Sequence, residues 1–562
     1  MKNIIKILLV FMILITGCTK DYLDINKDPN NPLEPQLALL LTNSQWGLGD
    51  ALSINGGLSN FAAVYMHQIT MREDPDQYGV NGGSYYANAG WSNLYAGPLQ
   101  DLELIIRQGE ENGDLLYAGI AKIMKAYAFS QLVDVYADVP FTEANRVPEI
   151  LYPVYDQGAQ IYPQLLSLLD DAIADLNDTE ARNLFVPADD DVIYGGDVDK
   201  WIRTANTIKL KLLTQTRLVN DVATSINELL SGDQLITEDF NFELPYGVSK
   251  TPDNRNPGSG EYEATQRSYY ISPWFYRIMK GQNPNIFTGI TDPRIPYYFY
   301  NQLKAGQDSR EGNPTEYRDG GFVSIYFGSI GRNRDHSTDG SMTVLGLFPV
   351  GGRYDDGGAK KVTGDFCTGA APYRFITYAD RLYMEAELVN TNVVAGDARE
   401  LLEDAMSASF ALVDHVVELT QPAKAVQAQT SVPLFSTTRQ DTTYIKAILT
   451  KYDAAADDSK RLEIIMTQKW IASFGSNVDQ WSDYRRTGYP VVFDPNNPSQ
   501  APDKLVESPD GPNVGADPEM IPVQLINAYP LSLPWGQDDL GKNPNSPAQK
   551  VPANYPVFWD VN

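Results

Sequence analysis

Residues 115–140, LLYAGIAKIMKAYAFSQLVDVYADVP, decide the fold class of the chain. Apolar side chains recur there at spacings of three and four residues, which places them on one face of an α-helix. These side chains are Leu116, Ile120, Ile123 and Tyr127. Pro140 cannot continue a helix and marks its end. The stretch therefore predicts one long helix with an apolar face that a neighbour must cover.

Three further segments of the first half have the same amphipathic pattern, at 94–111, 154–178 and 199–219. Long helices joined by short turns predict stacked αα-hairpins. No residue pattern of fixed period is present, so a tetratricopeptide-like stack is indicated by shape alone. Helical patterns return at 376–389 and 457–475.

Between the two helical parts the composition changes to Gly, Pro, Asn, Asp and Tyr, which predicts loops with short strands at most. Together, the helical and loop-rich segments predict a mostly α fold. They form a single predicted domain over 36–562 that contains a loop-rich variable region. Its parts are a helical scaffold at 36–235 and 366–490, the variable region at 236–365, and an irregular C-terminal segment at 491–562.

The N-terminus predicts export and a lipid anchor. Lys2 and Lys6 precede an unbroken apolar run from Ile7 to Ile15, too short to cross a bilayer as a helix. Residues 15–18, ITGC, resemble a bacterial lipobox, which predicts a signal peptide at 1–17, lipidation of Cys18 and a polar tether at 18–35. The alternative is an ordinary signal peptide with a chance cysteine. Lys20-Asp21 is a partial match to signals for the outer leaflet, so the leaflet stays open.

Charge and cysteine content exclude several classes of partner. The chain has 72 Asp and Glu against 44 Lys and Arg, two of which lie in the predicted signal peptide, so the mature net charge is near −30. Such a surface repels nucleic acid and anionic lipid. With Cys18 lipidated, Cys367 has no partner for an intramolecular disulfide, and stability must come from the core.

Enzyme chemistry finds no support in the sequence, and no catalytic residue is predicted. The three histidines are far apart, and no HExxH, GxSxG or GxxxxGK[ST] pattern is present. Glu385 and Glu387 are two residues apart on a predicted helix and point in different directions. Asp189, Asp190 and Asp191 offer oxygen ligands for a structural calcium ion but lack EF-hand spacing, and a solvated turn is the simpler interpretation. No cofactor or metal is predicted.

Four segments carry a resemblance to a known family. They are AKIMKAYAFSQLVDVYADVPFTEA (121–144), YGGDVDKWIRTANTIKLKLL (194–213), RFITYADRLYMEAEL (374–388) and QKWIASFGSNVDQWSDYRRTGYP (468–490). In this order they resemble the SusD/RagB-like outer-membrane lipoproteins, in particular the SusD-like type 2 branch. Ala137 departs from the glycine that family members often carry, and Trp535 is a local addition.

The resemblance implies an αα-hairpin scaffold that binds a nutrient at the cell surface. It also implies a lid on a SusC-like TonB-dependent outer-membrane barrel, held to the membrane by the lipid anchor alone and facing the cell exterior. No covalent chemistry is implied. The family motif residues are expected to be scaffold or partner-facing, and they are Trp201, Trp470, Trp481, Arg485 and Arg486.

The ligand is expected on irregular loops held by the rigid scaffold. Exposed aromatic rings stack on sugar faces or clamp peptide side chains, and Arg or Asn fixes orientation. The first candidate set comes from 71–91 and comprises Arg72, Tyr78, Tyr85, Tyr86 and Trp91, although Trp91 is expected at the start of a helix and packing there is an even alternative. The second comprises Trp274, Tyr276, Tyr326 and Arg332.

These patterns leave alternatives open. Oligosaccharide capture leads, and oligopeptide capture by the same architecture is close behind. A surface glycan hydrolase is more distant, because it needs an acid/base carboxylate pair that the sequence does not single out. A purely structural envelope lipoprotein would have no ligand pocket.

Overall fold

The computed structural model describes most of the chain beyond the predicted tether. The described residues are 36–71, 77–83, 85–264, 267–283, 286–310, 317–328, 340–420, 429, 431–476, 478–491 and 525–562. The predicted signal peptide, Cys18, the tether, Arg72 and Arg332 lie outside them. No helix among the described residues is both long and apolar enough to cross a bilayer.

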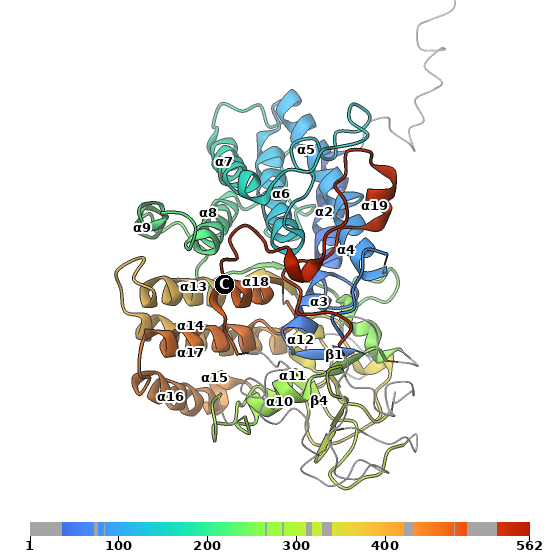
Figure 1. Ribbon diagram of the computed structural model, residues 1–562, viewed down its shortest axis with the longest axis vertical. Coiled ribbons are helices and arrows are strands. Elements are labelled where there is room, and N and C mark those ends of the chain that lie inside the picture. Colours follow the sequence, from blue (N-terminus) through green and yellow to red (C-terminus); the bar gives the residue numbers. More distant parts are fainter. Residues whose placement is uncertain are drawn as a thin grey trace, which may run out of the picture.

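The first half forms a block of helices that stack side by side (Figure 1). Its helices are α2 (Leu37–Leu52), α3 (Leu58–Tyr65), α4 (Tyr85–Tyr95), α5 (Pro98–Asn112), α6 (Leu115–Tyr136), α7 (Gly158–Asn177), α8 (Val198–Thr216) and α9 (Ala223–Ser231). The four helices predicted from the sequence are confirmed as α5 to α8. Helix α6 packs between α5 and α7 and is buried along most of its length.

Helix α6 ends earlier than its sequence pattern predicts. Its last residue is Tyr136, and Ala137 follows with φ 65° and ψ −80°. A non-glycine residue rarely adopts such a positive φ, so the helix is stopped by the turn and not by Pro140.

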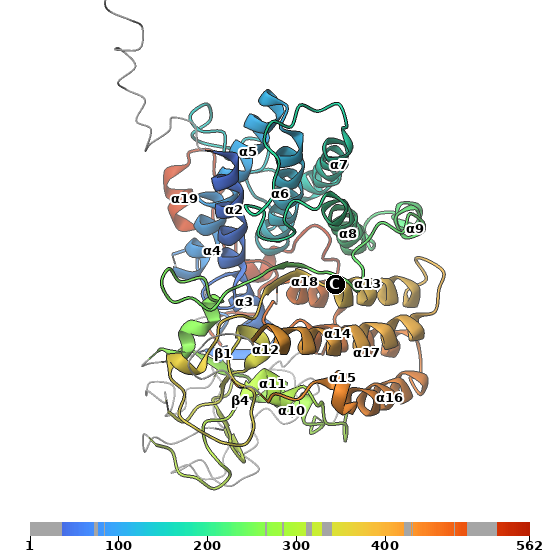
Figure 2. The ribbon, with the colours of Figure 1, turned by 180° about the vertical axis from the view of Figure 1, so that it is seen from behind.

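The second helical block lies across the first (Figure 2). It comprises α13 (Tyr378–Asn390), α14 (Ala398–Thr420), α15 (Phe435–Thr438), α16 (Gln440–Asp453), α17 (Asp458–Ala472) and α18 (Val478–Thr487). The predicted helices α13 and α17 are confirmed and pack against each other. Helix α13 starts at a capping box, in which Thr377 and Asp380 exchange side chain-to-backbone hydrogen bonds.

Several contacts join the blocks, among them those of α8 with α13 and α18. Helix α18 packs against α3 and α6. Strand β2 (Phe242–Leu244), from the end of the first block, pairs antiparallel with β8 (Tyr373–Ile376), which leads into α13. The largest hydrophobic core among the described residues therefore extends across both blocks.

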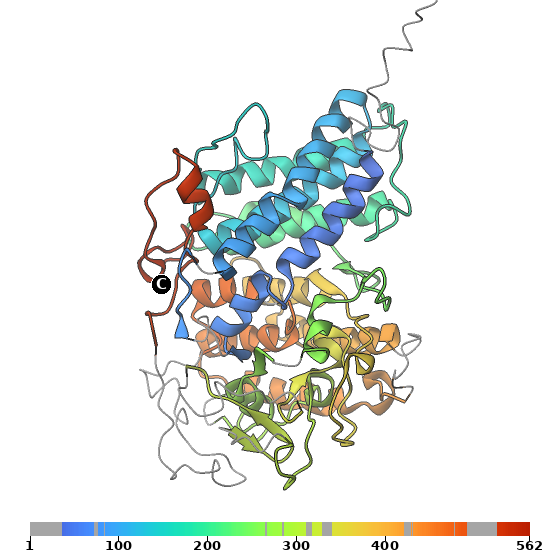
Figure 3. The same ribbon diagram turned by 90° about the vertical axis from the view of Figure 1, so that its right-hand side faces the viewer.

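The loop-rich segment gathers at one end of the molecule (Figure 3). Its strands are β3 (Tyr269–Ile271), β4 (Phe299–Tyr300), β5 (Tyr317–Asp319), β6 (Phe322–Ser324) and β7 (Val344–Leu345), and its helices are α10 (Pro273–Met279), α11 (Ile295–Tyr298) and α12 (Leu347–Val350). Strand β1 (Ile69–Met71), from the first half of the chain, joins them. The strands form two-stranded antiparallel pairs, β1 with β3, β4 with β7 and β5 with β6.

The C-terminal segment returns to the first helical block. It contains α19 (Gln537–Lys542) and otherwise little regular structure among residues 525–562. The Trp559 indole N–H donates to the Asp134 carboxylate of α6 at 3.0 Å. The Trp535 indole N–H donates to the Asp138 carbonyl at 2.8 Å, so both tryptophans fasten this segment to the scaffold.

Candidate ligand-binding site

The two loop stretches singled out in the sequence meet in space. β1 lies at the start of the first stretch and β3 at the start of the second, and they pair with Ile69 opposite Ile271 and Met71 opposite Tyr269. The Ser324 hydroxyl donates to the Ile271 carbonyl at 2.5 Å, which brings the segment before Tyr326 to the same place. We call the paired residues 69–71 and 269–271 the β1–β3 ribbon.

Tyr78 is buried, so the expectation that its ring is exposed is wrong. Only 5% of the residue is accessible, and its hydroxyl lies 3.1 Å from His67 Nε2. The ring packs against Phe327 and Tyr529 at centroid distances of 5.1 and 5.3 Å. An aromatic ring removes a large apolar area from water when it is covered, and here neighbouring rings cover it.

Trp91 is also buried, with 6% accessible, so of its two alternatives the packing one is confirmed, although its expected place at the start of a helix is wrong. It lies in the middle of α4, where its ring stacks on Tyr155 and meets the Tyr136 ring edge-on. Tyr85 and Tyr86 form the first turn of α4, and their side chains lie outside the described part.

Tyr276 and Tyr326 are core residues of the loop-rich end, so their expected exposure is wrong as well. The Tyr276 ring stacks on Phe322 with centroids 3.8 Å apart, and Tyr326 meets the Tyr317 ring edge-on. The loops have no long strands or helices to build a core, so their aromatic side chains build it instead.

Among the candidate aromatic residues whose side chains the structure describes, Trp274 is the one that is partly exposed. It is the second residue of α10, directly after β3, and packs against the core with part of its area accessible. Tyr269, at the end of the β1–β3 ribbon, is partly exposed in the same way and was not singled out in the sequence.

The family motif residues lie inside the scaffold. Trp201, Trp470, Trp481, Arg485 and Arg486 are each at most 3% accessible. The Arg485 guanidinium stacks on the Trp481 ring at 3.8 Å and donates to the Asp134 carbonyl of α6. Burial lowers the pKa of Arg485 to about 10.

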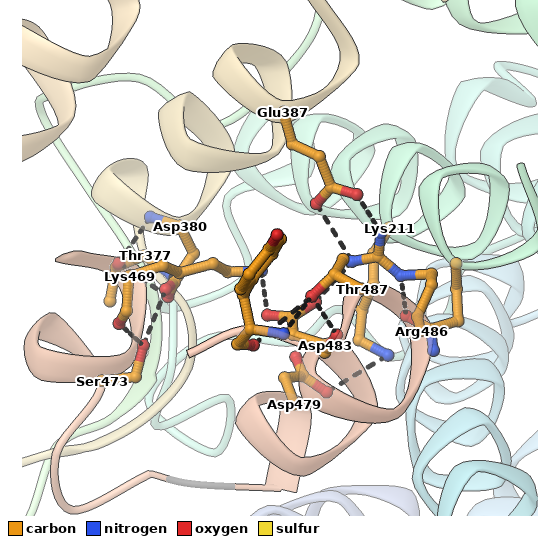
Figure 4. Close-up of polar contacts among 12 residues, drawn as sticks. Lys211, Thr377, Asp380, Glu387, Lys469, Ser473, Asp479, Asp483, Arg486 and Thr487 are labelled. Atoms are coloured by element: carbon orange, nitrogen blue, oxygen red, sulfur yellow. Dashed lines mark hydrogen bonds and ion pairs between the residues drawn. The ribbon is translucent and has the colours of Figure 1, made fainter. Parts of the chain in front are cut away.

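Buried ion pairs hold α8, α13, α17 and α18 together (Figure 4). Arg486 pairs with Glu387 of α13 and with Asp483 of its own helix. Lys469 of α17 pairs with Asp483 at 2.7 Å. Charges in these positions serve the packing of the scaffold, since their side chains are at most 5% accessible.

The aspartates considered for calcium organise a turn. The Asp191 carboxylate accepts hydrogen bonds from the Gln45 amide, the Trp201 indole and the Gly196 backbone, at 2.6 to 2.8 Å. Asp190 accepts from the Tyr117 hydroxyl. Across the described part of the chain, no group of three or more His, Cys, Asp and Glu side chains is placed to hold a metal ion.

A cleft of about 670 Å³ opens where the two helical blocks meet, away from the β1–β3 ribbon. Tyr194, Phe240 and Tyr378 line it together with acidic residues and His415 of α14. His415 Nε2 lies 2.9 Å from Glu243, and this hydrogen bond raises the pKa of His415. This cleft could not be predicted from the sequence, because its walls come from segments far apart along the chain.

The chain belongs to the SusD-like type 2 family, described as starch-binding and associating with the outer membrane, whose model matches residues 29–508. Solved structures with the same fold include a chitin-binding protein (18% identity, TM-score 0.64, covering 94% of this chain and 100% of the other). A SusD homologue from Bacteroides fragilis is 17% identical with TM-score 0.64, covering 94% of this chain and 99% of the other. A SusD/RagB family protein from Bacteroides thetaiotaomicron is 20% identical with TM-score 0.65 over the same shares.

No curated protein matches the chain. The family model and the shared fold make this chain a SusD/RagB-like protein of the class of outer-membrane-associated binding proteins. The predicted mostly α, tetratricopeptide-like scaffold is confirmed.

Proposed function

We propose that this protein captures an oligosaccharide at the cell surface and passes it to a SusC-like TonB-dependent barrel, on which it sits as a lid. The capture involves no covalent chemistry. Lipidated Cys18 and the tether hold the protein at the outer membrane, facing the exterior.

One observation carries the choice of site. The β1–β3 ribbon joins two loop stretches about 200 residues apart at the loop-rich end of the scaffold, and Trp274 and Tyr269 are partly exposed there. A partly exposed aromatic ring on a supported loop is the surface on which a sugar ring stacks. Oligopeptide capture at the same surface is the second candidate, because an aromatic face also accepts peptide side chains.

The test is isothermal titration of the chain from residue 19 against oligosaccharides and against a peptide digest. Trp274→Ala should weaken binding of the preferred class at least tenfold, which is about 1.4 kcal/mol. Trp46→Ala is the matched control, because Trp46 is a partly buried tryptophan on α2 that contacts Tyr246. Saturable heat from the peptide digest alone would replace the sugar with a peptide.

The lid role and the anchor are tested separately. A tagged full-length chain pulled from outer membranes should bring a barrel of TonB-dependent size with it, and its absence would contradict the lid. Cys18→Ala should release the protein from the membrane fraction. If the protein shortens oligosaccharides during incubation, it is a glycan hydrolase and the proposal of binding without covalent chemistry is wrong.

A further inference from the structure

The cleft between the two helical blocks has the composition of a recognition site. Its walls are the turn before α8, the segment leading into β2, the start of α13 and one face of α14. Figure 2 shows α8 above α13 and α14 on this side of the molecule. At about 670 Å³, the space falls within the range of pockets for small molecules.

Negative charge in the cleft exceeds positive charge. Its carboxylates are Glu238, Asp239, Glu243 and Asp404, and its basic side chains are Lys200 and His415. Glu243 is paired with His415 at 2.9 Å. Within the described ranges, Glu238, Asp239 and Asp404 have no basic partner in any ion pair, so their charge is available to a ligand.

Two of these carboxylates share the cleft with one aromatic ring. Glu238 and Asp404 come from segments far apart in the sequence and line the cleft together with Tyr378. Burial is the largest cause of the raised pKa of the Tyr378 hydroxyl, and the two carboxylates raise it further, whereas Arg381, whose guanidinium lies 5.8 Å from the centre of the ring, lowers it. Tyr378 starts α13, and its backbone N–H donates to the Asn241 side chain at 2.9 Å, which fixes the ring at the cleft.

The cleft already holds one ammonium group against aromatic faces. Lys200 Nζ lies 5.9 Å from the centre of the Tyr194 ring and 5.7 Å from that of Phe240. Its nearest carboxylate is Asp197, at 4.0 Å, and 38% of the lysine side chain is accessible. Aromatic faces attract ammonium groups within about 6 Å, so the walls of this cleft suit a cation.

We propose that this cleft is a second ligand site, which binds an oligosaccharide carrying free primary ammonium groups. Sugar hydroxyls would meet Asn241 and Ser407, the ring would lie against Tyr378, and the ammonium would sit between Glu238 and Asp404. The choice of a sugar as the carrier rests on the proposed oligosaccharide capture, whereas the preference for a cation rests on the cleft itself.

The experiment compares glucosamine oligomers with their N-acetylated counterparts, which have the same backbone without the charge. The chain from residue 19 should bind the glucosamine oligomer at least tenfold more tightly, and added salt should weaken that binding. The double variant Glu238→Gln, Asp404→Asn should lose at least tenfold. Both residues are exposed, so the variant should fold normally.

Glu403→Gln is the matched control, since Glu403 neighbours Asp404 on α14 but pairs with Arg399 and does not line the cleft. The proposal is overturned if glucosamine oligomers do not bind, or if the double variant and Glu403→Gln bind them alike. If trilysine bound as tightly as the glucosamine oligomer and the double variant lost the same affinity for it, the assignment of a sugar as the carrier would be overturned. The salt dependence and the loss in the double variant report on the cleft alone, whereas the titration of Trp274→Ala with uncharged oligosaccharides reports on the β1–β3 site. The failure of one site and that of the other therefore give different results.

Discussion

Replacing Glu387 by Gln should destabilise the scaffold more than any other single change of charge on α13. The Glu387 carboxylate is fully buried and serves two basic side chains, Arg217 of the α8 C-terminus at 2.8 Å and Arg486 of α18. These contacts tie three helices of the two blocks to one another (Figure 4). A glutamine keeps the shape of the side chain and removes only its charge.

The magnitude follows from burial. Arg217 and Arg486 are 6% and 1% accessible, so neither guanidinium can recover its lost partner from water. Breaking a buried ion pair costs about 3–5 kcal/mol because it leaves an uncompensated charge. For a chain of 562 residues the entropy of unfolding is about 1 kcal/mol per kelvin. The midpoint of thermal unfolding should therefore fall by about 3–5 °C.

Glu385→Gln is the matched control, because Glu385 lies two residues away on the same helix. It pairs with Arg381 at 2.5 Å, and both side chains keep contact with water, at 12% and 18% accessible. An ion pair between i and i+4 on a helix contributes about 0.5 kcal/mol. Calorimetric melts of the two variants should differ by several degrees. Equal melting midpoints would show that Arg217 and Arg486 do not need the Glu387 charge, which would contradict the prediction.

Three smaller predictions concern single positions. Ala137→Gly should raise the free energy of unfolding by about 1 kcal/mol, because Ala137 holds a positive φ of 65° that glycine adopts without strain, and a lowered melting midpoint would contradict this. His415 has a pKa raised by its hydrogen bond to Glu243, so its stabilisation is full below about pH 6.5 and is lost as the pH rises through the folded-state pKa. The free energy of unfolding of the wild type should therefore exceed that of His415→Gln by less at pH 8.5 than at pH 5.5. The change should be less than about 1 kcal/mol, because 41% of the His415 side chain is exposed. A difference that stays constant over this pH range would show that the hydrogen bond to Glu243 does not stabilise the fold. Cys367 is 2% accessible and burial raises its pKa to about 12, so a thiol reagent should label the chain from residue 19 only after unfolding, and rapid labelling of the native chain would contradict the buried position.

The helices were the most predictable part of this fold. Periodicity within 115–140 predicts α6 with a single apolar face, whereas the helix is buried on nearly all sides between α5 and α7. Helix α14 has the same signal, since Leu402, Met406, Phe410 and Val413 recur at spacings of three and four and are buried, yet it is not among the helices predicted from the sequence. Local spacing suffices for such elements because a helix forms its hydrogen bonds within itself.

The strands could not be predicted in the same way. β1 and β3 have three residues each, and they are held by pairing with each other across about 200 residues of sequence. Three residues carry no measurable periodicity, and the partner of a strand is set by the tertiary fold. The meeting of the two loop stretches is therefore a property of the folded chain.

The exposure of the candidate aromatic residues could not be predicted for a related reason. Tyr78, Trp91, Tyr276 and Tyr326 were chosen because aromatic residues in loops can face a ligand, yet each is at most 6% accessible. A tyrosine or tryptophan has an apolar body that can line either a site or a core, and sequence does not show which. In a segment poor in helices and strands, the rings themselves provide the packing.

The exposed carboxylates of the cleft present the opposite case. Glu238 and Asp404 look like ordinary surface charge in a chain with 72 acidic residues, and only the fold places both in one cleft with Tyr378. Long-range pairing of β2 with β8 holds the segment from 238 to 244 against the start of α13. Two surfaces of this protein, the β1–β3 ribbon and the cleft, thus both depend on short antiparallel pairs between distant segments. A substitution that loosened one pair should therefore affect binding at its own surface and leave the other intact.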